Sequence, residues 1–429
     1  MHSFDINMEN LSKMEGHAKL DIRVKDDKVE FAKFSIMENQ RFYEQAVRGQ
    51  SIMTAPQLMS RICGTCSIAH LTCCIEAVEN AVGITPTEQS LVMKKLATYG
   101  LMIRDHALHL YFFSLPDLLE KDSILDFDEN NAKEHKLIHD SFDVKRAGNA
   151  LSTLIAGRAV HATNPFVGGF VKPPDDEGIK KSIEELRKIR PVVLDLIEVF
   201  HSWDEKFERD TDFVALSTRD FSFLEGEIKS SRGMCIKERD YLEHLIKIVI
   251  PYSSAPGFEF EGEEFMVGAL SRMNINRESL HPQTRQDAAE FLKTFPSNNI
   301  FHNNLAQALE ILHSIDHATD LLENTRFKKE NLQKPVINEE KVGVGVIEAP
   351  RGTLYYKLTV GKTAKIKKAT VIVPTAQNQI NIEKDIAKLV EDKINTMTKE
   401  QIQYELEKLI RSYDPCMSCA SHFLKINWM

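Results

Sequence analysis

The sequence predicts a mainly helical protein with a minor antiparallel β-sheet, an α+β fold. Long segments place apolar residues at helical spacing, and shorter segments near both ends of the chain alternate as strands do. The chain has 429 residues, of which 42% are hydrophobic and 27% are charged. This composition is typical of a globular protein with a large buried core.

Strand patterns occupy residues 18–24 and 29–36, joined by a polar Asp-Asp-Lys turn. Together they predict an antiparallel hairpin with one buried face. Strand patterns return at residues 342–350, 354–360 and 367–375. These segments account for the minor antiparallel sheet of the predicted fold.

Helical patterns occupy most of the middle of the chain. Residues 87–119 are apolar nearly all round from Tyr99 to Leu119, which is typical of a helix in a protein interior. Residues 176–210 predict an amphipathic helix that Pro191 should kink or divide. Two further helices are expected, at residues 298–327 and 382–413.

The charge balance excludes some classes of protein. A net charge of −9 argues against a nucleic-acid-binding surface, which needs a basic stripe. No apolar run approaches the roughly 20 residues of a membrane span, and no secretory signal is visible at the start of the sequence. We therefore expect a soluble, cytoplasmic protein.

The seven cysteines indicate metal binding. An odd number in a long chain argues against a disulfide framework, and reduced thiols at close spacing can bind metal. Two Cys-x-x-Cys pairs, Cys63/Cys66 and Cys416/Cys419, can each present two thiolates. The others, Cys73, Cys74 and Cys235, are expected to be buried as small apolar side chains.

For two isolated pairs, a structural zinc site is the favoured interpretation. Zinc pairs, however, usually lie within a few tens of residues of each other, whereas these lie at opposite ends of the chain. If the pairs share a metal, residues 1–429 form one interlocked domain.

The residues around the cysteines resemble the large, catalytic subunit of nickel–iron hydrogenases. The cysteine motifs are Arg-x-Cys-Gly-x-Cys-x-x-x-His from Arg61 and Asp-Pro-Cys-x-x-Cys-x-x-His from Asp414. The resemblance covers nearly the whole chain. Further matching motifs are MEGH (Met14–His17), RFYE (Arg41–Glu44), DHALHLYFFSLPD (Asp105–Asp117), GRAVH (Gly157–His161) with Gly168–Gly169, EAPRG (Glu348–Gly352) and VPTAQN (Val373–Asn378).

The resemblance implies a helical core in which the two cysteine pairs meet at a buried bimetal site. Cys63 and Cys416 would be terminal ligands of nickel. Cys66 and Cys419 would bridge nickel to an iron that also carries carbon monoxide and cyanide. The implied reaction is the reversible heterolytic cleavage of molecular hydrogen.

The resemblance also implies residues around the metals. Glu44, His422 and the carbonyl of Val371 match the ligands of a magnesium ion, and His70 matches a histidine that donates to a bridging sulfur. From the residues alone, Glu44 would pass as a surface charge and His70 as a core histidine.

Four thiolates and two cyanides would carry more negative charge than two divalent metals neutralise, so nearby cations and donors are expected. By resemblance, Arg351 lies over the metals between Asp105 and Asp414, and Pro350 and Thr375 contact the cofactor, Thr375 as a donor to cyanide. Alternatively, Arg351 is a loop residue in a salt bridge and Asp414 caps a turn before Pro415.

Splitting hydrogen requires a hydride acceptor beside a base. The resemblance implies the metal pair as the acceptor, Cys416 as the base, and Glu15 as the carboxylate that relays the proton outward. With four cysteines assigned, too few remain for an iron–sulfur cluster on this chain. An iron–sulfur small subunit is therefore expected to take the electrons.

Three segments look most like the alpha subunit of cytoplasmic, NAD(P)-linked sulfhydrogenases: residues 105–117, 265–274 and 303–311. This resemblance implies diaphorase partners that carry FAD and NAD(P). MEGHAK, by contrast, resembles hydrogenases that feed heterodisulfide reductase or ferredoxin. Two positions depart from the common pattern: Tyr356 stands where many relatives have histidine, and Ala162 follows His161 where proline is common.

The family also implies maturation. By this resemblance, a dedicated protease would remove residues 423–429 after His422, and nickel-insertion factors would load the site. Two alternatives remain at this stage. One is a catalytically empty relative of the kind found in respiratory complex I, and the other is a structural zinc protein.

Overall fold

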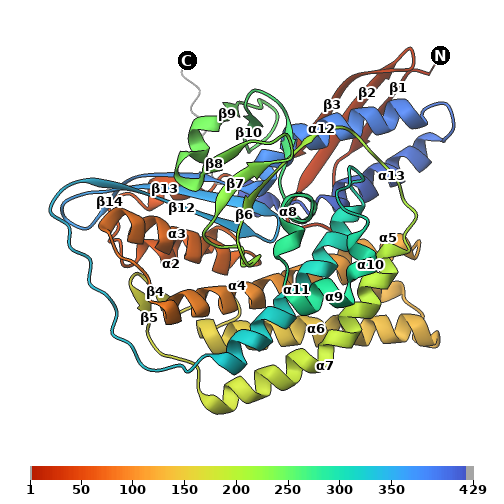
Figure 1. The fold of residues 1–429 in the computed structure, drawn as a ribbon. Coiled ribbons are helices and arrows are strands. Elements are labelled where there is room, and N and C mark those ends of the chain that lie inside the picture. Colours follow the sequence, from red (N-terminus) through yellow and green to blue (C-terminus); the bar gives the residue numbers. More distant parts are fainter. Residues whose placement is uncertain (1, 422–429) are drawn as a thin grey trace, which may run out of the picture.

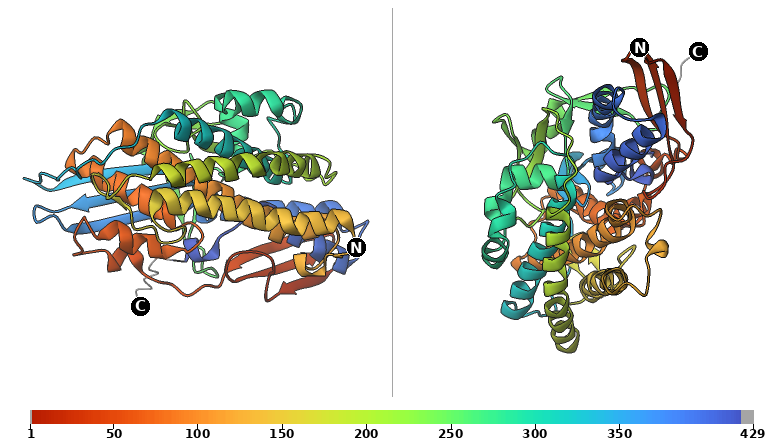
Figure 2. Two further views of the ribbon diagram at one scale, coloured as in Figure 1. Left: turned by 90° about the horizontal axis from the view of Figure 1, so that it is seen from below. Right: turned by 90° about the vertical axis from the view of Figure 1, so that its right-hand side faces the viewer.

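The structure, a computed structural model, describes residues 2–421. Four long helices form one layer of the molecule (Figures 1 and 2). They are α4 (Glu88–Leu108), α6 (Ala132–Ala156), α7 (Asp176–His201) and α11 (His302–Asn324). Helix α4 packs against α6 and α11, and α7 packs against the same two helices from the other side. The apolar segment expected to run through the interior is therefore α4, as its composition predicted.

Helix α4 continues without a break beyond Leu108. A π-helical turn (His109–Ser114) and α5 (Leu115–Leu118) complete the helix expected over residues 87–119. π-Helical turns frequently occur at functional sites. This one lies one turn beyond Asp105.

A three-stranded antiparallel sheet covers α3 (Ser67–Val82). Its strands are β12 (Lys341–Ala349), β13 (Gly352–Val360) and β14 (Ile366–Ile372), which confirms the three strand patterns predicted there. Gly343 and Gly345 let β12 approach α3 closely, because a Cβ at either position would clash with the helix backbone. This contact fixes α3, whose N-terminus begins directly after Cys66.

A second antiparallel sheet contains the predicted hairpin. Strands β2 (Ala18–Lys25) and β3 (Lys28–Ile36) pair with Leu20 opposite Phe34, and β3 packs against α12 (Pro374–Lys393). An additional strand, β1 (Phe4–Met8), pairs with β2. The first and last parts of the chain therefore pack together (Figure 1).

The region between α7 and α8 (Ala269–Asn276) forms short strands that the sequence patterns did not predict. β6 (Asp212–Ser217), β7 (Glu227–Ser230) and β8 (Cys235–Lys237) are antiparallel, and β11 (Phe265–Met266) pairs with β6 in parallel. The prediction that Cys235 is buried was wrong: it lies on the outer strand β8 and is exposed. An edge strand has one unpaired side and buries less.

Two helix predictions need correction. The helix expected over residues 382–413 is divided into α12 and α13 (Lys399–Ser412). Thr398 begins α13 with a capping box, in which its hydroxyl accepts from the Gln401 N–H and the Gln401 side chain accepts from the Thr398 N–H. Pro191 lies within α7 without dividing it, and α7 ends at His201 instead of residue 210.

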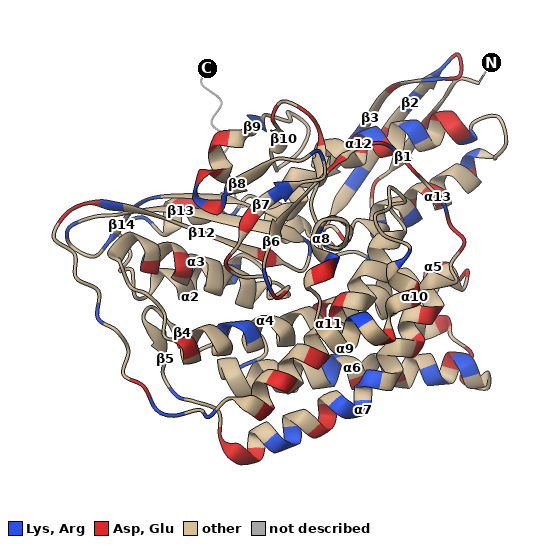
Figure 3. Cartoon of the chain, viewed as in Figure 1, with Lys and Arg blue, Asp and Glu red and all other residues tan. Residues whose placement is uncertain are grey.

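The remaining elements are short. They are α1 (Tyr43–Ala46), α2 (Ala55–Met59), β4 (Pro165–Phe166), β5 (Gly169–Phe170), β9 (Leu245–Ile248), β10 (Gly257–Phe260), α9 (Pro282–Asp287), α10 (Ala289–Leu292) and α14 (Met417–Ala420). Within residues 2–421, no helix is long and apolar enough to cross a membrane. Acidic and basic residues are interspersed along α6 and α7 (Figure 3).

Candidate metal centre

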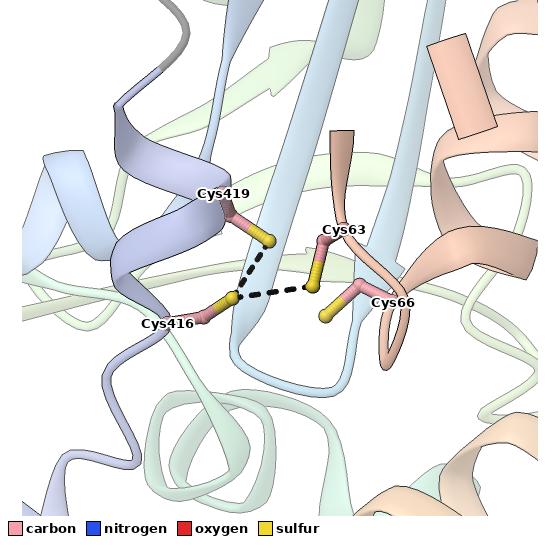
Figure 4. Close-up of side chains that lie close together, drawn as sticks. All are labelled: Cys63, Cys66, Cys416 and Cys419. Carbon is pink, nitrogen blue, oxygen red and sulfur yellow. Dashed lines mark hydrogen bonds between the residues drawn. The ribbon is translucent and has the colours of Figure 1, made fainter. Parts of the chain in front are cut away.

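The four motif cysteines converge at one buried point (Figure 4). Their sulfur atoms all lie within 4.8 Å of one another. The Cys416 sulfur lies 3.5 Å from that of Cys63 and 2.9 Å from that of Cys419. This confirms that the two Cys-x-x-Cys pairs, from opposite ends of the chain, meet in space.

Each pair lies where a helix begins. Cys63 is extended between a 3-10 turn (Ser60–Ile62) and α3, and Cys66 occupies the N-cap of α3. Cys416 occupies the N-cap of α14, which places Cys419 one turn later on the same face. Each short loop therefore directs two sulfurs to one point.

Arg41 holds the two cysteine loops together. Its Nη2 donates to the carbonyl of Ile62 at 2.7 Å and to the carbonyl of Ser418. Its backbone N–H donates to the carbonyl of Ser421 at 3.2 Å. One side chain thus fixes the N-terminal pair relative to the C-terminal pair.

The donor set suits a soft transition metal. Hydrogen bonds from Cys416 and the other thiols lower the pKa of Cys63 well below its ordinary value, whereas burial raises the pKa of Cys416 and Cys419. A metal that binds must displace the remaining thiol protons, and thiolates select nickel, iron or zinc over hard cations. The residues therefore fit a thiolate-bound metal centre.

Arg351 lies beside this centre between two carboxylates. Its Nη1 lies 2.7 Å from Asp105 Oδ2 and 3.2 Å from the Cys66 sulfur, and its Nη2 lies 2.9 Å from Asp414 Oδ1. Although burial lowers the pKa of Arg351, Asp105 and Asp414 raise it well above its ordinary value. Its buried Nε finds no acceptor within residues 2–421, so a donor remains for a bound group.

A second buried arginine contacts the loop that carries the N-terminal pair. Arg104 Nη2 donates to the carbonyl of Thr65 at 2.7 Å, between Cys63 and Cys66. Burial lowers the pKa of Arg104, while Asp105 and the thiols oppose that shift. Cationic groups therefore lie close to the sulfurs, as a site with excess negative charge requires.

Glu15 contacts the candidate base directly. Its Oε2 lies 3.1 Å from the Cys416 sulfur and accepts from the Ser418 N–H at 3.0 Å. Glu15 is half-buried, so this carboxylate connects a buried sulfur with the region nearer solvent. The backbone N–H of Cys416 donates to the Thr375 hydroxyl oxygen at 2.9 Å. The hydroxyl proton of Thr375 is therefore free to donate to a bound group.

His70 and Tyr356 form a buried pair. His70 Nδ1 lies 2.8 Å from the Tyr356 hydroxyl, which leaves Nε2 as the nitrogen able to donate to a sulfur. Burial lowers the pKa of His70 to about 4, so the ring is neutral near pH 7. Tyr356, where many relatives have histidine, therefore serves as the partner of His70.

The candidate magnesium ligands lie partly within the described residues. Glu44 Oε1 accepts from the Val371 N–H at 2.7 Å, and burial raises the pKa of Glu44. The structure thus brings these two residues together from α1 and β14. His422 lies outside the described residues.

Pro350 precedes Arg351 in a turn that a buried ion-pair network holds. Arg272 donates to the carbonyls of Ala349 and Pro350 at 3.0 and 2.9 Å and pairs with Glu310 and Glu348. Arg272 and its ion pairs therefore hold the turn that carries Arg351 in place.

Sequence analysis assigned no role to Arg41, Arg104 or Arg272. An arginine within an apolar helix, such as Arg104 beside Asp105, is a usable signal because charged residues are rarely buried without a partner. Arg41 lies in the quoted RFYE motif, but its contacts with both cysteine loops depend on the fold alone.

Comparison with known proteins agrees with this geometry. Residues 41–141 and 240–422 match the family described as nickel-dependent hydrogenase. The chain is 31% identical to sulfhydrogenase 1 subunit alpha of Pyrococcus furiosus over 98% of both chains. It is 27% identical to the NAD-reducing hydrogenase HoxS subunit beta of Cupriavidus necator, over 97% of this chain and 94% of that one.

Solved structures share the fold. A NAD+-reducing [NiFe]-hydrogenase in the hydrogen-reduced state superposes with a TM-score of 0.87 at 25% identity, over 98% of this chain and 99% of that one. A [NiFeSe]-hydrogenase of Dm. baculatum superposes with a TM-score of 0.79 at 21% identity, over 98% and 100%, which shows the fold alone. On the family match and the converging cysteines, this chain belongs to the nickel-dependent hydrogenases as a catalytic large subunit.

Proposed function

We propose that this chain catalyses the reversible heterolytic cleavage of molecular hydrogen at a nickel–iron pair held by its four clustered cysteines. The cluster itself carries this proposal, because four buried sulfurs lie together beside a charged arginine and a carboxylate. Cys63 and Cys416 would be terminal ligands of nickel, and Cys66 and Cys419 would bridge to iron. Residues 1–429 would form one interlocked domain.

The charge balance supports carbon monoxide and cyanide on the iron. Arg351 and Arg104 supply buried positive charge, and the Arg351 Nε and the Thr375 hydroxyl offer donors. In this proposal Arg351 and Pro350 contact the diatomic ligands, and Thr375 donates to a cyanide. Asp105 and Asp414 hold the guanidinium in place.

The chain's own residues would move the proton. When bound, the metal pair supplies the acceptor for the two electrons of the hydrogen molecule. Cys416 then takes the proton on its sulfur and passes it to Glu15 Oε2, 3.1 Å away. The Ser418 N–H fixes this carboxylate oxygen, and His70 would donate to a bridging sulfur.

Two electrons must leave the site for each proton pair produced. We propose an iron–sulfur small subunit as the first acceptor and diaphorase subunits with FAD and NAD(P) beyond it, in the cytoplasm. The sulfhydrogenase and NAD-reducing relatives support this route. Transfer to a ferredoxin or to heterodisulfide reductase is the alternative.

A magnesium ion held by Glu44, the Val371 carbonyl and His422 would stabilise the C-terminal end.

Metal analysis tests the proposed function. We expect the purified active complex to exchange hydrogen with deuterium. We also expect this chain to hold nickel and iron in equal amounts, once the iron of the partner subunits' iron–sulfur clusters has been subtracted from the total. Cys419→Ser should lose both metals, because a hydroxyl is a poor ligand for nickel. Cys235→Ser, at an exposed position, should retain them. Zinc in place of nickel in the active wild type would contradict the proposal.

We also propose C-terminal processing after His422, with a protease and nickel-insertion factors as transient partners. Ser421 is fully buried, and Arg41 ties its carbonyl to the cysteine loops. Lys425 and Trp428 could not follow into such an interior without an unpaired charge or strain.

The expected product of this processing is an active subunit that lacks residues 423–429. Intact-mass spectrometry of nickel-loaded protein measures it, with the metal-free precursor as the control that still includes Met429. An active, nickel-loaded subunit with the mass of the full chain would contradict the proposal.

A further inference from the structure

A buried histidine lies one residue beyond the helix that carries Asp105, away from the metal ligands. His109 belongs to the π-helical turn and is 1% exposed. Its Nδ1 lies 2.6 Å from Gln307 Oε1. Its Nε2 lies 2.8 Å from the carbonyl oxygen of Arg411 and 3.3 Å from the Ser114 hydroxyl.

The partners of Nε2 are acceptors. The Arg411 carbonyl can only accept a hydrogen bond. The Ser114 hydroxyl donates its own proton to Asn304 Oδ1 at 3.0 Å, so toward His109 it too can only accept. Nε2 must therefore carry a proton.

The partner of Nδ1 is also an acceptor, because Gln307 is oriented by Asp414. Gln307 Nε2 donates to Asp414 Oδ2 at 3.0 Å, while the other oxygen of Asp414 pairs with Arg351. Reversing the amide would place its oxygen against the carboxylate. With the amide held this way, Gln307 Oε1 faces Nδ1, and Nδ1 must carry a proton as well.

We propose that His109 is a buried imidazolium, protonated on both ring nitrogens, that positions Arg351 through Gln307 and Asp414. A neutral ring would leave a lone pair facing an acceptor at 2.6 or 2.8 Å, which is a repulsive contact. The charge is satisfied by hydrogen bonds to three acceptors, which are Gln307 Oε1, the Arg411 carbonyl and the Ser114 hydroxyl. Arg411 contacts His109 through its backbone carbonyl only. Its guanidinium is paired with Asp117 at 2.6 Å, so its positive charge is balanced separately from that of His109.

The same chain contains a matched neutral histidine. His313, also fully buried, accepts from the His281 N–H at Nδ1 and faces the Phe221 carbonyl with Nε2. One donor and one acceptor satisfy a neutral ring. Burial also lowers the pKa of His313 well below its ordinary value.

Neutron diffraction from deuterated crystals of the active complex tests the protonation state. We expect deuterium on both nitrogens of His109, on Gln307 Nε2 toward Asp414, and on Nε2 alone of His313. Deuterium on only one nitrogen of His109, or a reversed Gln307 amide, would overturn the proposal. This measurement does not depend on activity, so its failure is distinct from failure of the proposed function.

A variant tests the positioning role, which rests on the proposed function. His109→Gln can donate to only one of the two acceptors. We expect turnover about tenfold lower at unchanged KM and nickel content, with shifted infrared bands of the diatomic ligands. His313→Gln is the control and should keep the wild-type bands. Wild-type turnover and bands in metal-loaded His109→Gln would refute the role, and the diffraction test stands even if that variant does not assemble.

Discussion

Glu15→Gln is expected to lower hydrogen–deuterium exchange by about 100-fold or more, because glutamine cannot accept and release a proton. The Glu15 Oε2 atom lies 3.1 Å from the Cys416 sulfur and is fixed by the Ser418 N–H. The amide has nearly the same size and Glu15 is not a proposed ligand, so nickel and iron content should stay unchanged. Exchange activity and metal content are measured on the same purified complex.

A neighbouring carboxylate provides the control. Glu38 lies next to Gly16 and accepts from the His17 N–H at 3.0 Å, and within residues 2–421 it forms no hydrogen bond to a cysteine. Glu38→Gln should therefore keep full exchange. Full exchange in metal-loaded Glu15→Gln would remove Glu15 from the proton pathway and leave Cys416 without its proposed acceptor.

Arg351→Lys is expected to assemble with both metals and to lose about 100-fold in turnover, a loss comparable to removing one preorganised donor from an active site. A flexible ammonium cannot span Asp105 and Asp414 while it also faces the Cys66 sulfur, as the planar guanidinium does. Turnover per nickel, with infrared spectra of the loaded enzyme, measures the effect.

Arg190 is the matched control, since it also lies between two carboxylates but belongs to α7, which packs against α6 and α11 in the helical layer. Its guanidinium pairs with Asp316 and Asp287, each at 2.6 Å. Arg190→Lys should cost some stability and leave turnover per nickel unchanged. If both lysine variants turned over at the wild-type rate, Arg351 would be only a structural residue.

Local sequence patterns were sufficient for the elements that extend over several residues. The strands at residues 18–36 and 342–372 and the interior helix α4 follow from periodicity, which depends only on which face of an element is buried. The break before α13 was also present in the sequence, as the Thr398/Gln401 capping box, but the charged pattern continues across it. The short strands β6 to β11 span only two to six residues each, which is too few for a periodic pattern to identify them.

The sequence by itself determined the cysteine pairs, the motif residues around them and the family to which they point. Only the tertiary structure decided which distant side chains touch: Arg41 on both cysteine loops, Arg104 on the carbonyl of Thr65, and Gln307 between His109 and Asp414. Spacing along the chain sets which residues share a turn or a face. These contacts join residues 21 to 377 positions apart and depend instead on how the helical layer and the sheets pack, and no local pattern encodes that packing.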